Sequence, residues 1–67
     1  MAEKEYVKIT LRAARVNAGL TQCQVMQALG YARSTLKAWE TGERSPKLQD
    51  LKRLCALYSV STEQIEA

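Results

Sequence analysis

The stretch LTQCQVMQALGYARSTLKAWETG, residues 20–42, decides the fold of this chain. It contains two short amphipathic runs, which are separated by Gly30 and two further residues. Each run carries apolar side chains at helical spacing: Val25, Met26 and Leu29 in the first, Leu36 and Trp39 in the second. Thr21 can cap the first helix, and Gly42 can end the second. A turn this tight predicts two helices that cross steeply and bury their apolar faces against each other.

The outer face of the second helix, predicted over residues 33–41, is small and cationic. The side chains on it are Arg33, Ser34, Lys37 and Ala38. A short, rigidly held helix with such a face is typical of helices that enter the DNA major groove. An isolated cation is more often ordinary solvated surface, so the interpretation depends on the helical pair that surrounds these residues.

Length and composition limit what the chain can be. Its 67 residues predict a single domain, and 46% apolar residues favour a packed core over disorder. The longest apolar stretches are a few residues, which excludes a membrane span. The start of the chain mixes acids with bases and lacks the apolar centre of a signal peptide. These features predict a cytoplasmic protein.

The residue types also argue against an enzyme. The sequence contains no histidine, no glycine-rich phosphate loop and only two distant cysteines, Cys23 and Cys55. We therefore assign no catalytic residue, no metal site and no cofactor, and we expect both cysteines to be free thiols.

Positive charge is concentrated in one part of the chain. The formal net charge is +3, and residues 33–53 alone carry six cations against three acids, also a net +3. The end of the chain is acidic, with Glu63 and Glu66. This distribution favours a polyanionic partner that contacts the second helix and the residues after it. Lys52 and Arg53 point away from the apolar stripe of the next helix, so we expect them to be plain surface.

The remaining segments predict a lead-in and three more helices. Residues 1–9 form the lead-in, in which Tyr6, Val7 and Ile9 could pair as an edge strand, and residues 10–67 form the domain. Thr10 can cap a first helix that runs through Ala18 and stops at Gly19. Pro46 bars helix through Ser45, so the fourth helix spans residues 48–58. Its inner face consists of Leu51, Leu54, Cys55 and Tyr58. Ser61 and Gln64 form a capping box for a fifth helix around Ile65. The predicted fold is all-α, a compact bundle of five short helices.

Several motifs in this frame occur in a fixed order. They are Arg15, GLTQ (residues 19–22), LG (29–30), STL (34–36), WETG (39–42), SP (45–46) and YSVS (58–61). With these motifs the chain resembles the Cro/cI-type (XRE-like) helix-turn-helix family of phage and bacterial transcriptional regulators. The resemblance covers residues 9–66 and implies a lambda-repressor-like DNA-binding domain.

The resemblance also implies roles for individual residues. Base edges would be contacted by Arg33, Ser34, Lys37 and Ala38. Backbone phosphates would be contacted by Gln22, Arg44, Ser45 and Lys47. Gln22 would in addition brace the first residues of the recognition helix. Arg15 and Glu40 would form a structural ion pair behind that helix.

Two positions depart from the family pattern. Met26 stands where the close approach of the two helices usually requires alanine or glycine, so the helix pair must repack slightly. Ala32 stands where a serine or threonine usually caps the recognition helix, so the start of that helix lacks a side-chain cap. Neither departure removes a predicted base-contacting position.

The predicted function is a sequence-specific double-stranded DNA-binding transcriptional regulator, with repression by promoter occlusion as its simplest mechanism. Family members bind inverted-repeat operators as homodimers, and here residues Val60 to Ile65 are the expected dimer surface. So small a surface predicts dimerisation that is weak without DNA. Two alternatives remain at this point: an antitoxin or accessory DNA-binding factor with a protein partner, and a protein-interaction module that does not bind DNA. Such a module would show an exposed apolar patch and no salt-dependent affinity for DNA.

Overall fold

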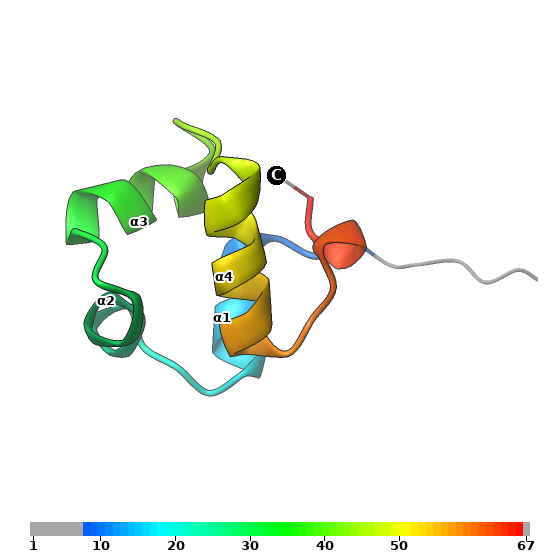
Figure 1. Cartoon of the computed structure of the whole chain (residues 1–67), viewed down its shortest axis with the longest axis horizontal. Helices are drawn as coiled ribbons and strands as arrows, with labels where there is room; N and C mark the ends of the chain where they lie inside the picture. The colour runs from blue at the N-terminus through cyan, green and yellow to red at the C-terminus, as the bar shows by residue number, and fades with distance from the viewer. Residues whose placement is uncertain (1–7, 67) are drawn as a thin grey trace, which may run out of the picture.

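The computed structural model describes residues 8–66, which form a set of short helices (Figure 1). In chain order the elements are α1 (Leu11–Asn17), α2 (Gln22–Leu29), α3 (Arg33–Thr41), α4 (Leu48–Tyr58) and the 3₁₀ turn η1 (Thr62–Gln64). The predicted all-α class is confirmed. The predicted pairing of Tyr6 and Val7 lies outside the described residues. Within the described part of the chain, no helix is long and apolar enough to cross a membrane.

Threonine side chains cap the first two helices, as predicted. The Ala13 amide donates to the Thr10 hydroxyl oxygen at 3.0 Å at the start of α1. At the start of α2 the Gln24 amide donates to the Thr21 hydroxyl at 3.1 Å, and the Thr21 amide donates to the Gln24 side-chain oxygen at 2.8 Å. This is a complete capping box, which satisfies two backbone donors at once. At the start of α3, Ala32 supplies no side-chain cap.

The turn between α2 and α3 sets the angle between them. Gly30 has a φ of 82°, in the left-handed region that glycine adopts without steric cost, and its amide donates to the Met26 carbonyl at 2.8 Å. Figure 1 shows α2 nearly along its axis while α3 runs across the view, so the two helices cross steeply. The glycine turn therefore produces the steep crossing of α2 and α3 that the sequence predicts.

The core lies where α1, α2, α3 and α4 meet. Its fully buried side chains include Val25, Leu36 and Leu54. Met26 is half-buried and packs against this core, so the thioether is accommodated at the helix crossing. Trp39 is also half-buried, and its ring meets the Tyr31 ring edge-on at 4.8 Å between centroids. Cys55 is buried and free, and burial raises the pKa of its thiol.

The two ends of the described chain meet in a short backbone pairing. Ile9 and Ile65 form a parallel bridge, in which the Ile9 amide donates to Gln64 at 2.8 Å and the Glu66 amide donates to Ile9 at 2.9 Å. The predicted capping box of Ser61 and Gln64 is present, and the Ser61 amide donates to the Gln64 side-chain oxygen at 3.0 Å. The fifth helix that it opens is only a single 3₁₀ turn, because the chain becomes extended at Ile65 to make this bridge. Ile9 also packs against the core.

The bridge also changes the expected dimer surface. The Ile65 side chain is only 6% exposed and is part of the core. Val60 is half-buried against the same core. Ile65 is therefore not available to a second copy, and Val60 is available only in part.

Candidate functional site

Helix α3 presents one exposed polar face. Arg33, Ser34 and Lys37, which the sequence places on that face, are all exposed. Leu36, on the opposite face, is 1% exposed and anchors α3 to the core. Because the anchoring residue lies between the exposed ones in sequence, α3 is held firmly while its outer side chains stay free to contact a ligand.

Ala38 does not lie on this face, which corrects the prediction made for it. Its side chain is buried, with 6% exposure. The chain after Gly42 folds back onto this part of α3, where the Arg44 amide donates to the Ala38 carbonyl at 3.2 Å. A buried methyl group cannot meet a thymine methyl, so we remove Ala38 from the candidate base-contacting residues.

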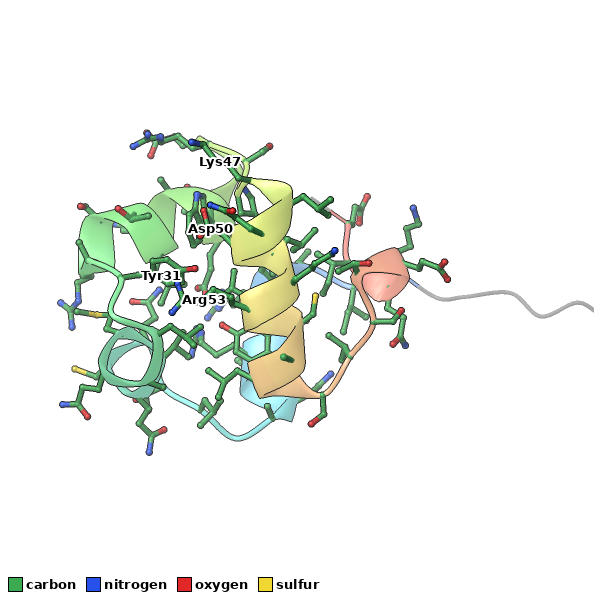
Figure 2. The ribbon with its side chains drawn as sticks, in the orientation of Figure 1. Tyr31, Lys47, Asp50 and Arg53 are labelled. Atoms are coloured by element: carbon green, nitrogen blue, oxygen red, sulfur yellow. The ribbon has the colours of Figure 1, made fainter. Side chains whose placement is uncertain are left out.

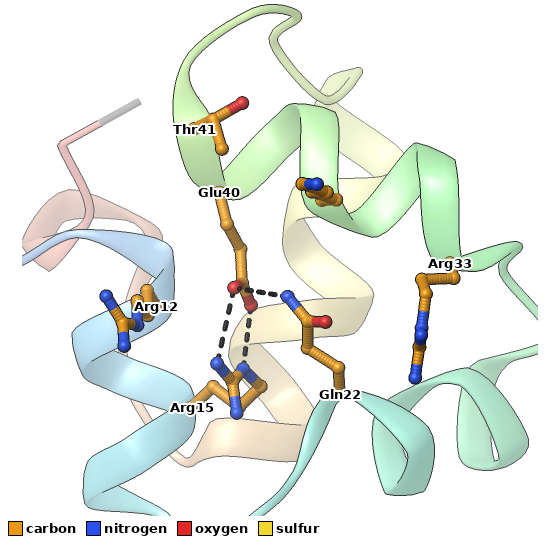
Figure 3. Close-up of a pocket in the computed structure, with 7 residues that line it drawn as sticks. Arg12, Arg15, Gln22, Arg33, Glu40 and Thr41 are labelled. Carbon is orange, nitrogen blue, oxygen red and sulfur yellow. Dashed lines mark hydrogen bonds and ion pairs between the residues drawn. The ribbon is translucent and has the colours of Figure 1, made fainter.

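A buried ion pair fixes α3 against α1. The Arg15 Nε donates to Glu40 Oε2 at 2.8 Å and its Nη2 donates to Oε1 at 3.3 Å, an arrangement with both carboxylate oxygens engaged (Figure 3). The two side chains are only 11% and 4% exposed. The Arg15 Nη1 also donates to the Leu20 carbonyl at 2.9 Å, so the same guanidinium holds the chain that enters α2.

Gln22 joins this ion pair from the first turn of α2. Its Nε2 donates to Glu40 Oε1 at 3.0 Å, so the carboxylate accepts from both α1 and α2 (Figure 3). Gln22 therefore braces the last turn of α3. The sequence placed its bracing role at the first residues of that helix; among residues 8–66 its side-chain hydrogen bond goes instead to Glu40, in the last turn.

An open groove lies between α1, the start of α2 and α3. Its volume is about 540 Å³, and its lining residues are Arg12, Arg15, Gln22, Arg33, Lys37, Glu40 and Thr41. Four of these are cations and one is an acid, so the groove carries a net +3. Predicted base-contacting, phosphate-contacting and ion-pair residues thus lie around one surface, joined by Arg12 and Thr41, which the sequence did not single out. Arg12 precedes Arg15 by three residues, a helical spacing that could have indicated it.

The remaining predicted phosphate-contacting residues lie in the loop after α3. Arg44, Ser45 and Lys47 are all exposed. A second cavity of about 260 Å³ lies between this loop and the domain, and its lining includes Trp39, Pro46 and Leu11 together with Arg44 and Ser45. The cations of the loop are therefore presented at the C-terminal end of α3, next to the exposed face of that helix.

The sequence predicted Arg53 to be plain surface, and this prediction is wrong. Its Nη2 donates to the Leu29 carbonyl at 3.1 Å, and its guanidinium lies 5.2 Å from the centroid of the Tyr31 ring. The Tyr31 hydroxyl donates to Asp50 Oδ1 at 2.8 Å (Figure 2). Burial, followed by the Asp50 carboxylate, raises the pKa of Tyr31. These contacts attach the turn between α2 and α3 to α4.

Comparisons with known proteins agree with this architecture. A family model described as a helix-turn-helix domain matches residues 9–67. The chain is 33% identical over 55 residues to the cryptic phage CTXphi transcriptional repressor RstR of Vibrio cholerae. That match covers 82% of this chain and 50% of the repressor, so the chain spans half the length of its curated relative. No solved structure matches the chain significantly. The chain belongs to the helix-turn-helix domain family.

Proposed function

We propose that this protein is a sequence-specific double-stranded DNA-binding transcriptional regulator, not an enzyme, and that α3 is its recognition helix. The helix-turn-helix domain and the similarity to a phage repressor support a DNA-binding regulator. The observation that carries the proposal is the exposed face of Arg33, Ser34 and Lys37 on a helix that a buried ion pair holds in place. The base-contacting side chains are therefore positioned before DNA arrives.

The dimensions of α3 suit the major groove of B-DNA. A helix with its side chains is about 10–12 Å across, and the groove is about 12 Å wide. The nine residues of α3 make a helix about 14 Å long. With the N-terminal end of α3 inserted, Arg33 and Ser34 reach base edges and Lys37 follows one turn later. Gln22 approaches a phosphate from the start of α2, and Arg44, Ser45 and Lys47 approach the backbone from the loop.

The mode of regulation that we propose is repression by promoter occlusion. A domain that occupies an operator excludes polymerase without any further activity. We propose binding as a homodimer to an inverted repeat, because a two-fold pair of recognition helices matches two half-sites one helical turn apart. A phage or bacterial repressor that acts on DNA in the cytoplasm fits the relative found.

The experiment that tests the proposal is selection of bound sequences from a random duplex pool. We expect recovery of an inverted repeat whose half-site centres lie about 34–36 Å apart, or a multiple of this distance. Recovery of single half-sites would support sequence-specific DNA recognition and contradict binding as a homodimer. A pool that shows no enrichment after several rounds, with folded protein, would contradict the proposed function.

The two alternatives gain no separate support from the structure. A protein-interaction module needs a continuous exposed apolar surface. Within residues 8–66 the large exposed apolar side chains are Val16 in α1 and Leu48 at the start of α4, which lie on different helices. An antitoxin or accessory factor needs the same kind of surface beside its DNA-binding face. The observations on the described residues therefore favour neither alternative.

A further inference from the structure

Arg12 contributes a cation to the groove from a helix outside the helix-turn-helix pair. Figure 3 shows Arg12 on α1 and Arg33 on α3 at opposite sides of the groove, with Gln22 and Glu40 between them. Arg12 is exposed, so its guanidinium can reach a ligand without unfolding any part of the domain. None of the roles described above uses this side chain.

The charge in the groove is not neutralised by its own acid. Glu40 is fully engaged by Arg15 and Gln22, and this buried pair is electrically neutral. The other cations of the groove are Arg12, Arg33 and Lys37. Among residues 8–66 none of these three takes part in a salt bridge. The groove holds a net +3, which equals the formal charge of the whole chain, so all other residues together sum to zero. The groove therefore favours an anionic ligand.

We propose that Arg12 is a further phosphate-contacting residue, which binds a DNA backbone phosphate at the α1 side of the recognition helix. The proposal rests on the proposed function. A guanidinium can bind two phosphate oxygens at once, which suits an exposed arginine at the rim of a groove. The contact is distinct from that of the loop, because Arg44 and Lys47 follow the C-terminal end of α3. The two contacts together would hold α3 in the major groove from two sides.

The test compares Arg12→Ala with Lys52→Ala, which removes an exposed cation on α4 that does not line the groove. Affinity for the selected operator and for an unrelated duplex is measured at several salt concentrations. We expect Arg12→Ala to lower the salt slope by about 0.9 per bound chain and to weaken both duplexes by roughly eightfold at 0.1 M salt. Lys52→Ala should leave the slope unchanged. Both variants should melt like the parent, since both side chains are exposed.

A second measurement locates the phosphate. Single phosphates of the operator are replaced by neutral methylphosphonates, and binding of the parent is compared with binding of Arg12→Ala. One substitution in each half-site should weaken the parent and have no further effect on the variant. If Arg12→Ala keeps the parental slope and sensitivity while Arg44→Ala lowers the slope, the Arg12 contact is overturned and DNA binding stands. If the parent binds duplexes without salt dependence, the proposed function itself fails.

Discussion

Tyr58 places a hydroxyl group in the core of this small domain. The residue is 4% exposed, and within residues 8–66 its hydroxyl has no hydrogen-bond partner. Burial, together with the nearby Glu40 carboxylate, raises the pKa of Tyr58 to about 12 from an ordinary value of 10.0. An unsatisfied buried hydroxyl costs about 1–3 kcal/mol, so the aromatic ring stabilises the core in spite of its polar atom.

Because of the Tyr58 hydroxyl, the stability of the domain should fall at alkaline pH. Below pH 10 the hydroxyl is protonated in the folded and the unfolded chain, and its contribution is constant. Between pH 10 and about 12 the unfolded chain loses the proton while the folded chain keeps it, so stability falls by at most about 3 kcal/mol. Tyr58→Phe should show a smaller loss in this window and should be at least as stable as the parent at pH 7. Urea unfolding at pH 7, 10 and 11 is the measurement. Lower stability of the variant at pH 7 would show that the hydroxyl makes a favourable bond.

Arg33 and Arg44 test the division between base and phosphate contacts. Arg33 lies on the first turn of α3, whereas Arg44 lies in the loop after it, and both are exposed. A bidentate arginine–guanine contact provides about 1–3 kcal/mol of discrimination. Arg33→Ala should therefore relax the preference at one base pair in each half-site. Arg44→Ala should weaken all sequences about equally. The measurement is affinity for matched and mismatched duplexes at one salt concentration. Similar behaviour of the two variants would make Arg33 another phosphate contact.

At the scale of elements, three helices depend on one carboxylate. Glu40 on α3 accepts from Arg15 on α1 and from Gln22 on α2. Removing its charge leaves the 11% exposed Arg15 side chain without its counter-ion. Breaking such a buried pair costs about 3–5 kcal/mol, which is a large part of the stability of a domain this small. The position of α3 thus depends on one largely buried carboxylate in its last turn.

Glu40→Gln should accordingly lower the melting temperature by at least about 10 °C and leave the preferred operator unchanged. Glu43→Gln is the matched control, because Glu43 is an exposed acid in the following loop and carries the same change of charge. Thermal melting followed by circular dichroism gives the stability. Sequence selection is repeated at a temperature at which the variant is folded. A variant that melts like the parent but selects different bases would place Glu40 in recognition.

The elements also show how far the sequence can predict this structure. Caps, glycines and apolar spacing are local signals, and they predicted α2, α3 and α4 closely, including the absent cap at Ala32. The errors come from contacts between distant residues. Ile65 becomes extended to pair with Ile9, at the other end of the described chain. Arg53 contacts Leu29 and Tyr31, more than 20 residues away, and no local pattern indicates that pairing.

The candidate site was predictable to a similar extent. Helical spacing predicted the exposed Arg33, Ser34 and Lys37, since a helix face follows directly from sequence positions. The Arg15–Glu40 pair was expected only from the family resemblance, because its members are 25 residues apart. The proposed role of Arg12 could not be predicted from the sequence, because it depends on the packing of α1 against α3. This packing places Arg12 in the same groove as Arg33 and Lys37.

At the scale of the whole molecule, few apolar side chains are left for self-association. Ile65 is used in the core, and the large exposed apolar residues of the described part are Val16 and Leu48. We therefore expect two chains to associate on adjacent half-sites of DNA, where binding to one duplex raises their local concentration.

Charge and stoichiometry can be measured together through the salt dependence of binding. Three exposed cations per chain are proposed to contact phosphates: Arg12, Arg44 and Lys47. Each neutralised phosphate contributes about 0.9 to the slope of log affinity against log salt, so two chains should give a slope of about −5 and one chain about −3. Sedimentation of the protein alone and with operator DNA gives the stoichiometry independently. A monomer that becomes two chains per operator, with a slope near −5, is the expected outcome. With two chains bound, a slope of about −3.6 would mean that Arg12 does not contact phosphate, and a slope of about −1.8 would mean that the loop cations do not. A flat response would remove DNA as the ligand and favour a protein-interaction module.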